Sequence, residues 1–380
     1  MDSVLIVAAE ASSSLYAQRL LEAWKAQGRN LQAFGIGSRS MEKVGFECLG
    51  RSEDLAVVGL QEVIKHFPLI RKTFHSLVEQ AVARKPKFAL LLDYPDFNLR
   101  LAKQLKKRGI TVIYYISPQV WAWRTGRVKQ IKKVVDHMLV LFPFEETFYR
   151  EHDVKCDFVG HPLLDELPDS LRDNSVHQVQ RQRFGIGDND LVLGLMPGSR
   201  KSEIEHHLET QLKAAQILVK RQPRVRPVLM IAPTMERERF GEAIAAMSMN
   251  IQIIKEDPLD MMALADVMLV KSGTATLMVG LMEKPMVIMY RMTAITAWIA
   301  KKLVTKTKFF GLVNLVMNRQ VAPELFQEEA SPERLATELE ALLFGPEREI
   351  ALKNLSEVRE ALGSKGATKR VLAILDGYLA

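Results

Sequence analysis

The sequence predicts an α/β protein with two doubly wound domains that face each other across a cleft. Three observations indicate this fold. The chain has 380 residues, which is too many for one ordinary hydrophobic core. Short Val, Ile and Leu runs alternate with amphipathic stretches, as in parallel sheets covered by helices on both faces. A polar stretch at 170–190 divides this alternation into two series of similar size.

The first series, residues 1–170, predicts an N-terminal domain. Its expected strands are the apolar runs at 3–9, 31–37, 88–93, 111–117 and 137–143. An amphipathic helix at 15–28 follows the first strand, and another helix is expected to begin at Asp96. The strand runs are continuously apolar, which is typical of strands buried on both faces.

The second series, residues 171–380, repeats the pattern and predicts a C-terminal domain. Its expected strands lie at 191–199, 227–233, 251–256, 267–273 and 285–290. Charged amphipathic helices follow at 331–343, 347–361 and 367–379, and these can pack back on the N-terminal domain. Doubly wound sheets bind ligands at the carboxyl ends of their strands, so side chains there are the candidates for function.

Composition narrows the class of protein. The formal net charge of +7 suits anionic partners such as nucleic acid, phosphorylated metabolites or a membrane surface. No apolar run is long enough for a transmembrane helix, and the N-terminus lacks the basic residues of a secretory signal. Cys48 and Cys156 form neither a disulfide framework nor a metal site, which indicates a reducing cytoplasm. The two cysteines therefore give no reason to expect a metal site.

Two acids surround a proline at the end of the expected strand at 88–93, in the stretch "LLLDYPDFN". Asp93 ends the strand, and Asp96 is a good N-cap for the helix that follows. We expect Pro95 to keep Tyr94 extended, so that the Asp93 carboxylate points into the cleft. There it can act as a general base that removes a proton from a hydroxyl group. The alternative for Asp93 is a capping or turn role.

The stretch "SPQVWAWRTGRVKQIKK" follows the next strand and combines aromatic and basic side chains. Its candidate binding residues are Gln119, Trp121 and Arg124. Aromatic rings beside cations can bind nucleic acid, hold a phosphorylated sugar or lie at a lipid interface. The alternative is one core tryptophan next to a solvated basic helix.

Two strand-to-helix turns in the second domain predict an anion site. In "PGSR", Gly198 allows a close backbone approach, Ser199 can cap the helix, and Arg200 lies at its start. Free backbone N–H groups beside a fork-shaped cation suit a diphosphate. A later strand end offers further small donors, namely Ser272, Gly273 and Thr274. The alternative is that both turns are plain helix starts; neither is a Walker A loop.

Residues 57–74 predict a membrane-binding helix. Apolar and basic side chains interleave there, as in helices that lie in a membrane interface. Pro68 is expected to break the run, so the segment cannot span a bilayer. The side chains expected to meet lipid are Val63, Ile64, Phe67 and Ile70. The alternative is that they pack in the core.

Four stretches together resemble one family. "LLDYPDFN", "SPQVWAWRTGRVKQI", "PGSRKSEI" and "SGTATL", in this order and spacing, resemble the lipid-A-disaccharide synthases, and the similarity runs from about residue 3 to 345. The resemblance implies a GT-B glycosyltransferase with two Rossmann-like domains, the first facing acceptor and membrane and the second holding UDP. It implies transfer from UDP-2,3-diacylglucosamine to 2,3-diacylglucosamine 1-phosphate, with release of UDP and inversion, and without metal or cofactor.

The resemblance also implies location and partners. Members are peripheral proteins on the cytoplasmic side of the inner membrane. The expected partners are thus a UDP-sugar lipid donor, a phosphorylated glycolipid acceptor and an anionic membrane surface, but not nucleic acid; a homodimer is compatible with the sequence.

By the same resemblance, Asp93 matches the proposed base and Arg200 the residue at the donor phosphates. The implied substrate-binding residues are Glu10, Ser12, Asp96, Asn98, Gln119, Trp121, Arg124, Gly198, Ser199, Arg200, Ser272, Gly273, Thr274, Asn314, Glu324 and Gln327. The chain departs from the family in two places. "AEASSS" at 9–14 replaces the family's GEASGD loop, and Met278 replaces a glutamate that can hold ribose hydroxyls.

Two other functions stay open at this point. One is a diverged relative on the same fold that uses a different nucleotide-sugar donor or none. The other is a non-catalytic protein that binds anionic lipid or nucleic acid through its basic surface. The catalytic interpretation is favoured because a binding module has no reason to place Asp93 at a strand end that faces a phosphate site.

Overall fold

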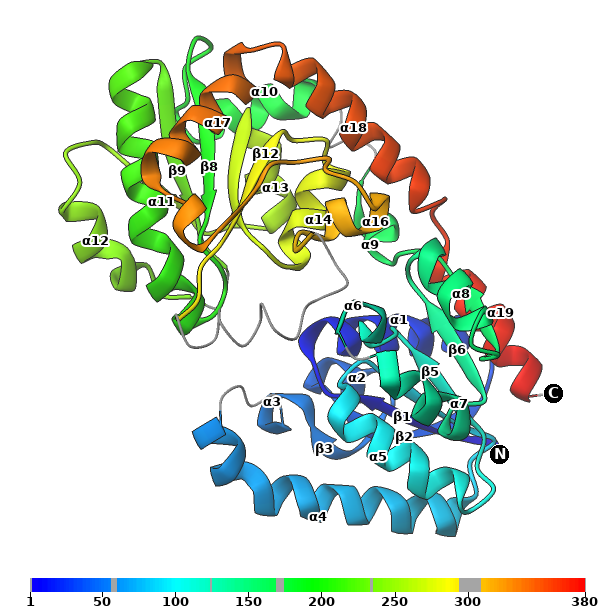
Figure 1. Cartoon of the computed structure of the whole chain (residues 1–380). Coiled ribbons are helices and arrows are strands. Elements are labelled where there is room, and N and C mark those ends of the chain that lie inside the picture. Colours follow the sequence, from blue (N-terminus) through cyan, green and yellow to red (C-terminus); the bar gives the residue numbers. More distant parts are fainter. Residues whose placement is uncertain are drawn as a thin grey trace. The chain divides into compact units, whose positions relative to one another are not determined.

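The computed structural model describes residues 2–55, 60–123, 125–168, 174–232, 235–293 and 309–379. The chain folds as two compact units (Figure 1). Unit 1 comprises Met1–Asp165 together with Ser364–Ala380, and unit 2 comprises Glu166–Gly363. The last helix of the chain thus belongs to the unit that contains the N-terminus.

Unit 1 is built on a seven-stranded sheet in the order β3-β2-β1-β4-β5-β6-β7, and every strand pair is parallel. The strands are β1 Asp2–Ala8, β2 Leu31–Gly37, β3 Glu47–Arg51, β4 Phe88–Leu92, β5 Val112–Tyr115, β6 His137–Val140 and β7 Cys156–Phe158. The helices are α1 Ala11–Ala26, α2 Arg39–Lys43, α3 Ser52–Leu55, α4 Leu60–Arg84, α5 Pro95–Lys106, α6 Val120–Trp123, α7 Val128–Val134, α8 Pro143–Arg150, α9 Leu163–Glu166, which ends at the boundary, and α19 Ala367–Leu379.

Unit 2 is built on a six-stranded parallel sheet in the order β10-β9-β8-β11-β12-β13. The strands are β8 Leu191–Met196, β9 Val225–Met230, β10 Gln252–Ile254, β11 Val267–Lys271, β12 Met286–Tyr290 and β13 Glu324–Phe326. The helices are α10 Asn174–Arg183, α11 Lys201–Arg221, α12 Gly241–Ala245, α13 Pro258–Leu264, α14 Thr274–Leu281, α16 Leu312–Met317, α17 Pro332–Phe344 and α18 Glu347–Ala361.

The predicted fold class is confirmed, since each unit has a parallel sheet with helices packed against it (Figure 1). All ten expected strands are present, and the sheets contain three further short strands at their edges, β3, β7 and β13, that the sequence pattern did not indicate. Strand β3 is half-exposed, and β7 and β13 have only three residues each. Edge strands of this kind lack the continuous apolar run that marks a central strand.

Both sheets reverse their strand order at one point. In unit 1, β1 is followed by β2 on one side and, later in the chain, by β4 on the other. In unit 2, β8 is likewise followed by β9 on one side and, later in the chain, by β11 on the other. The crevice outside such a switch point is where open α/β sheets bind their ligands. Each unit therefore offers one strand-end site.

The last helix, α19, is fastened to unit 1 by side-chain hydrogen bonds. The Trp24 indole N–H donates to Asp376 Oδ1 at 3.0 Å, and the Tyr378 hydroxyl lies 3.0 Å from His137 Nδ1. Helices α17 and α18 belong to unit 2.

Helix α4 continues through Pro68, so the expectation that Pro68 breaks this segment is wrong. A proline inside a helix removes one backbone hydrogen bond and bends the helix without ending it. Across the residues that the structure describes, no helix has both the length and the apolar character needed to cross a membrane.

Candidate active site

The switch point of unit 1 brings Glu10 and Asp93 close together. Strands β1 and β4 pair directly, with Ala8 opposite Leu92 at their ends. Glu10 follows the end of β1 by two residues, and Asp93 follows the end of β4 by one. The negative charge of Glu10 lies near enough to raise the pKa of Asp93. The acid that the sequence singled out thus lies where the topology predicts a ligand site.

The backbone at Asp93 is strained. Asp93 and Tyr94 both have left-handed conformations, with φ of 49° and 45°. The expectation that Pro95 keeps Tyr94 extended is therefore wrong. Left-handed conformations cost roughly 1–2 kcal/mol for each non-glycine residue, so the surroundings must hold them in place.

Buried polar groups hold this turn. The Asp93 carbonyl accepts hydrogen bonds from the Tyr114 hydroxyl at 2.6 Å and from Asn98 Nδ2 at 2.8 Å. Asn98 also donates to the Leu92 carbonyl at 3.1 Å, and its side chain is fully buried. Asn98 therefore positions the end of β4, and in this conformation it cannot touch a substrate.

The carboxyl group of Asp93 has an unusual proton affinity. Burial, followed by the charge of Glu10, raises its pKa from 3.8 to about 6. A carboxylate of that pKa is ionised at neutral pH and is a stronger base than an exposed aspartate. The site can therefore deprotonate a hydroxyl group.

Asp96 does not cap the following helix, contrary to the expectation. Helix α5 begins at Pro95 with Tyr94 as its N-cap, so Asp96 lies within the first turn. Its side chain is 72% exposed and forms an ion pair with Arg127 at 2.6 Å. Pro95 is the reason for the shift, because proline favours the first position of a helix.

Trp121 uses its indole N–H within the protein. The group donates to Glu145 Oε1 at 3.1 Å, and the ring packs edge to face on Phe144. Glu145 is buried at the start of α8, and burial raises its pKa to about 7. Sequence reasoning missed this carboxyl group, which lies in an ordinary helix-start pattern. Gln119 is exposed, whereas Arg124 lies outside the described residues.

The serines of the first loop fasten the start of α1. Ser13 Oγ bonds both the N–H and the carbonyl of Glu10, at 3.0 and 2.9 Å. Ser14 Oγ donates to the Ala8 carbonyl at 3.0 Å. Both hydroxyls are buried, which leaves Glu10, partly exposed, and Ser12, exposed, as the loop's candidate contacts.

Unit 2 has a cavity of about 340 Å³ at the carboxyl ends of β8, β9 and β11. The two predicted turns, at 198–200 and 273–274, both line it. Five of its lining residues are methionines, namely Met196, Met230, Met261, Met262 and Met278. The cavity therefore combines a soft apolar wall with two helix starts.

The turn after β8 requires a glycine. Gly198 has a φ of +126°, and a Cβ atom there would lie 2.6 Å from the Cβ of Glu203. The Ser199 N–H donates to Glu203 Oε2 at 3.0 Å. Helix α11 begins at Lys201 with Arg200 as its N-cap, so the expectation that Ser199 caps it is wrong. The Glu203 carboxylate fastens this turn instead.

Two charged residues that sequence reasoning missed lie in the cavity wall. Lys271 Nζ is 2.9 Å from Glu203 Oε1, and both side chains are 16% exposed. Burial raises the pKa of Glu203, but the hydrogen bond and charge of Lys271 outweigh it and hold that pKa below 4.5. Arg200 lies 3.7 Å from the same carboxylate with 57% of its side chain exposed. Lys271 is recognisable in the sequence only as the last residue of a strand.

The turn after β11 agrees with the expectation in part. Helix α14 begins at Thr274 with Gly273 as its N-cap, and Thr274 is exposed. Ser272 is buried and its hydroxyl donates to the Phe310 carbonyl at 2.9 Å. Gly273 and Thr274 thus face the cavity, whereas Ser272 supports the turn from behind.

Comparison with known proteins identifies the family. A family model described as lipid-A-disaccharide synthetase matches residues 4–374. A lipid-A-disaccharide synthase from Trichlorobacter lovleyi is 42% identical over 374 residues, which cover 98% of this chain and 96% of that protein. Another, from Myxococcus xanthus, is 39% identical over 368 residues, with 97% and 95% covered. The chain belongs to the lipid-A-disaccharide synthase family.

Solved structures support the same architecture. A UDP-GlcNAc 2-epimerase from Neisseria meningitidis, solved with UDP-GlcNAc, matches with a TM-score of 0.61 at 12% identity over 98% of both chains. MurG from Acinetobacter baumannii matches with a TM-score of 0.58 at 14% identity, over 99% of this chain and 100% of that one. These likenesses show the GT-B fold. As a member of the lipid-A-disaccharide synthase family, the chain is an enzyme, a glycosyltransferase.

Three residues of the family's later motif form side-chain hydrogen bonds to the backbone of nearby loops. Glu324 accepts from the N–H groups of Phe310 and Gly311, at 2.7 and 2.8 Å. Asn314 is fully buried, with its amide bonded to Glu324 and to the backbone around Ala322. Gln327 forms two hydrogen bonds with the backbone of Met292, each of 3.0 Å. In this conformation their side chains support loops rather than face a ligand.

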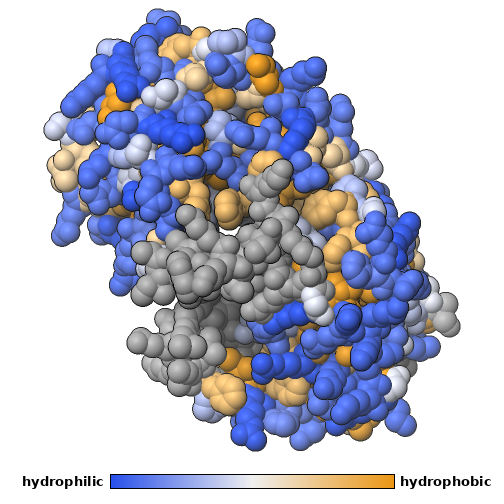
Figure 2. All heavy atoms as spheres, viewed as in Figure 1, coloured by the Kyte–Doolittle hydropathy of each residue, from blue (hydrophilic) through white to orange (hydrophobic). Residues whose placement is uncertain are grey.

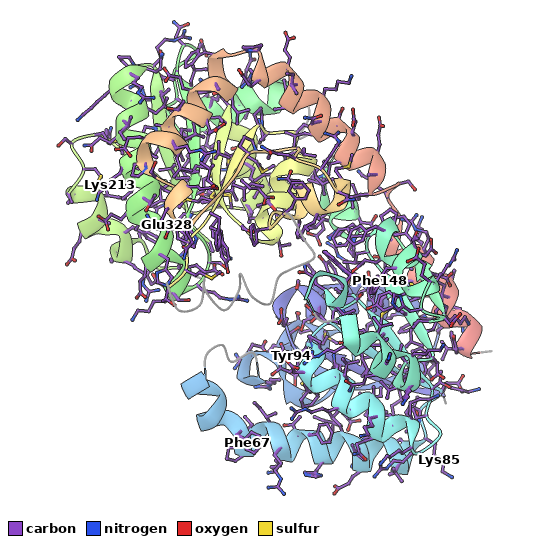
Figure 3. The ribbon with its side chains drawn as sticks, viewed as in Figure 1. Phe67, Lys85, Tyr94, Phe148, Lys213 and Glu328 are labelled. Carbon is purple, nitrogen blue, oxygen red and sulfur yellow. The ribbon has the colours of Figure 1, made fainter. Side chains whose placement is uncertain are left out.

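The predicted membrane residues differ from one another. Phe67 lies on α4 (Figure 3) and is 55% exposed, whereas Ile70 is partly buried against the core of unit 1. Ile70 thus packs with part of its side chain against the core, and its contact with lipid stays a prediction. The side chains of Val63 and Ile64 lie outside those that the structure describes. Figure 2 shows hydrophobic residues on the surface over α4.

Proposed function

We propose that this enzyme transfers 2,3-diacylglucosamine from its UDP derivative to the 6-hydroxyl of 2,3-diacylglucosamine 1-phosphate, with Asp93 as general base. Family membership supports the reaction. The observation that carries the assignment is the position of Asp93, a partly buried carboxyl group at the switch point of unit 1 with a pKa of about 6. Such a group combines the location and the proton affinity of a base.

The reaction is a single displacement. The Asp93 carboxylate takes the proton of the 6-hydroxyl while that oxygen attacks the anomeric carbon of the donor. The bond from the anomeric carbon to the diphosphate breaks, and UDP leaves with the bonding electrons. Attack from the face opposite the leaving group inverts the anomeric carbon. The remaining requirement is positive charge to stabilise the departing diphosphate.

The cavity of unit 2 supplies that charge in this proposal. Arg200 is mostly exposed at the start of α11 and presents a planar fork that suits a diphosphate. The first turns of α11 and α14 add backbone N–H groups without partners inside their helices. Lys271 lies in the same wall, where its charge is shared with Glu203.

The uracil ring and the ribose of the donor would lie against the cavity wall that the five methionines form. Met278 occupies the position where the family has glutamate, and a thioether accepts only weak hydrogen bonds. We therefore propose that the ribose hydroxyls are held more weakly here than in a relative with the carboxylate. In this proposal Glu10 and Ser12 of the first loop contact the acceptor.

The acyl chains of both substrates require contact with a bilayer. Exposed Phe67 on α4 and the net charge of +7 support peripheral binding to an anionic membrane surface. We propose the cytoplasmic side of the inner membrane as its location.

A direct assay tests the proposal. The purified full chain is incubated with both substrates, and the phosphorylated disaccharide and UDP are measured. Asp93→Asn should lower kcat by about 10²–10⁴-fold while UDP affinity stays at the wild-type value. Near-normal turnover by Asp93→Asn, or no product from the wild type, would show the proposal to be wrong. Arg200→Ala should weaken UDP binding, and Arg200→Lys should restore it only in part.

A further inference from the structure

Unit 1 has a groove that one neighbour of Asp93, Tyr94, helps to line. This groove of about 420 Å³ lies between α4 and the first half of α5. Its aromatic floor includes Phe74 and Phe97, whose rings meet edge to face with centroids 5.5 Å apart. Tyr94 packs against Phe97 at 5.7 Å and also lines the groove. One part of the groove therefore adjoins Asp93, because Tyr94 is the next residue in the chain.

The rim of the groove carries positive charge. Arg71 comes from α4 and Arg100 from α5, and both are exposed. Among the described residues neither arginine forms an ion pair. The one acidic residue in the lining is Asp96, and its carboxylate is bonded to Arg127 at 2.6 Å. The groove thus offers two cations whose charge is not neutralised by its own lining.

The apolar part of the groove reaches the surface. Phe67 and Ile70 line it, and 55% of Phe67 is exposed. An exposed phenylalanine above an aromatic floor favours an apolar guest, and two cations on the rim favour an anionic head group. A concave, mostly apolar site with a few polar groups binds one molecule rather than a flat surface.

We propose that this groove binds one fatty acyl chain of the phosphorylated glycolipid acceptor, with the anionic head group held by Arg71 and Arg100. The inference rests on the proposed function, because the acceptor there carries acyl chains and a phosphate. The groove would fix the sugar ring next to Asp93, through Tyr94. It is a binding subsite, and its residues take no part in the chemical step.

Calorimetry with monomeric alkyl phosphates tests the binding directly. Chains of increasing length are titrated into the full chain below their micelle concentration. Each added methylene should tighten Kd by up to about fourfold until the groove is full, after which Kd should stay constant. Inorganic phosphate should bind more weakly because it has no alkyl chain. A neutral alkyl glycoside with the same chain length should also bind more weakly, because it has no anionic head group.

The chain offers matched controls on the same helices. Phe67→Ser and Arg100→Ala should each weaken alkyl phosphate binding, the second by about threefold to fivefold. Leu69→Ser and Lys103→Ala change exposed residues that do not line the groove, and both should bind as the wild type does. Unfolding midpoints of all four variants show that the fold is kept.

Three outcomes would overturn the inference. These are a Kd independent of chain length, equal losses in the groove and control variants, and binding only to vesicles of anionic phospholipid with none to monomeric alkyl phosphate. In the transfer assay, Arg100→Ala should raise KM for the acceptor and leave kcat and the donor KM unchanged. If Arg100→Ala forms product with an unaltered KM for the acceptor, the groove proposal is wrong and the proposed function stands. If the wild type forms no product, the proposed function itself is wrong.

Discussion

The pH dependence of transfer should reveal the coupling between Glu10 and Asp93. Proton abstraction needs the Asp93 carboxylate, so kcat/KM should rise with pH and level off above about pH 6, the pKa of this group. Glu10 contributes to that value by its negative charge, which disfavours ionisation of Asp93. Glu10→Gln removes the charge. It should therefore lower the pKa of Asp93 and move the acid limb of the profile to lower pH.

The structure limits the size of this effect. The pKa of Asp93 is raised from 3.8 to about 6, and burial contributes more than Glu10 does. Burial persists in Glu10→Gln, so the acid limb should move only part of the way from about pH 6 toward 3.8. Glutamine is nearly isosteric, and its side-chain oxygen can keep the hydrogen bond that the Glu10 side chain accepts from the Ser13 backbone in the capping box. The start of α1 should therefore be unchanged.

The assay is kcat/KM for disaccharide formation between pH 5 and 8 at constant low ionic strength, with wild type and variant side by side. Asp96→Asn is the matched control, because Asp96 is a neighbouring carboxylate that does not raise the pKa of Asp93. Its acid limb should coincide with that of the wild type. An unmoved limb in Glu10→Gln, or one moved to higher pH, would refute the reasoning. High salt should reduce the difference.

Four further changes test the rest of the site. Asp93→Asn should raise the melting temperature above pH 6 but not below pH 4, because folding raises the pKa of Asp93 and its ionised form destabilises the protein. Gly198→Ala should weaken UDP binding by about tenfold in calorimetry, because the added Cβ meets Glu203 in a backbone conformation that costs roughly 1–3 kcal/mol. Lys271→Met should lower stability at pH 7 by about 1–3 kcal/mol, and the loss should shrink as Glu203 is protonated at acid pH. Met278→Glu should tighten UDP binding, and an unchanged affinity would mean that another residue holds the ribose.

Much of the fold could be predicted from sequence because its signals are local. Central strands such as β4 and β8 are continuous apolar runs, and their ends are marked by Asp93 and by Gly198. The edge strands β3, β7 and β13 could not be found, since they are short or half-exposed. The order of strands in each sheet, which places two sites at switch points, is a property of tertiary structure.

The site shows a different limit. Sequence patterns selected residues near the ligand sites but did not separate those that face a ligand from those that hold a turn. Asp93 and Asn98 stand in one motif, yet Asn98 is buried with its amide nitrogen bonded to two backbone carbonyls. Glu324 likewise uses both carboxylate oxygens on backbone N–H groups. Burial and hydrogen-bond partners decide the role, and neither can be read from residue type or spacing.

The two strand-end sites share one physical arrangement. In each, the chain leaves a strand in a conformation with positive φ, at Asp93 and at Gly198, and a polar side chain from the following helix bonds the backbone of the turn. Asn98 does this in unit 1 and Glu203 in unit 2. Strained turns persist only when their surroundings hold them. The neighbouring helix fixes the position of these turns. Residues there can therefore lower the stability of the fold, as partly buried Asp93 does when it is ionised. A substitution at Asn98, which is fully buried, should thus impair turnover without removing a group that contacts a substrate, and a substitution at Glu203 should impair UDP binding by loosening the turn at Gly198.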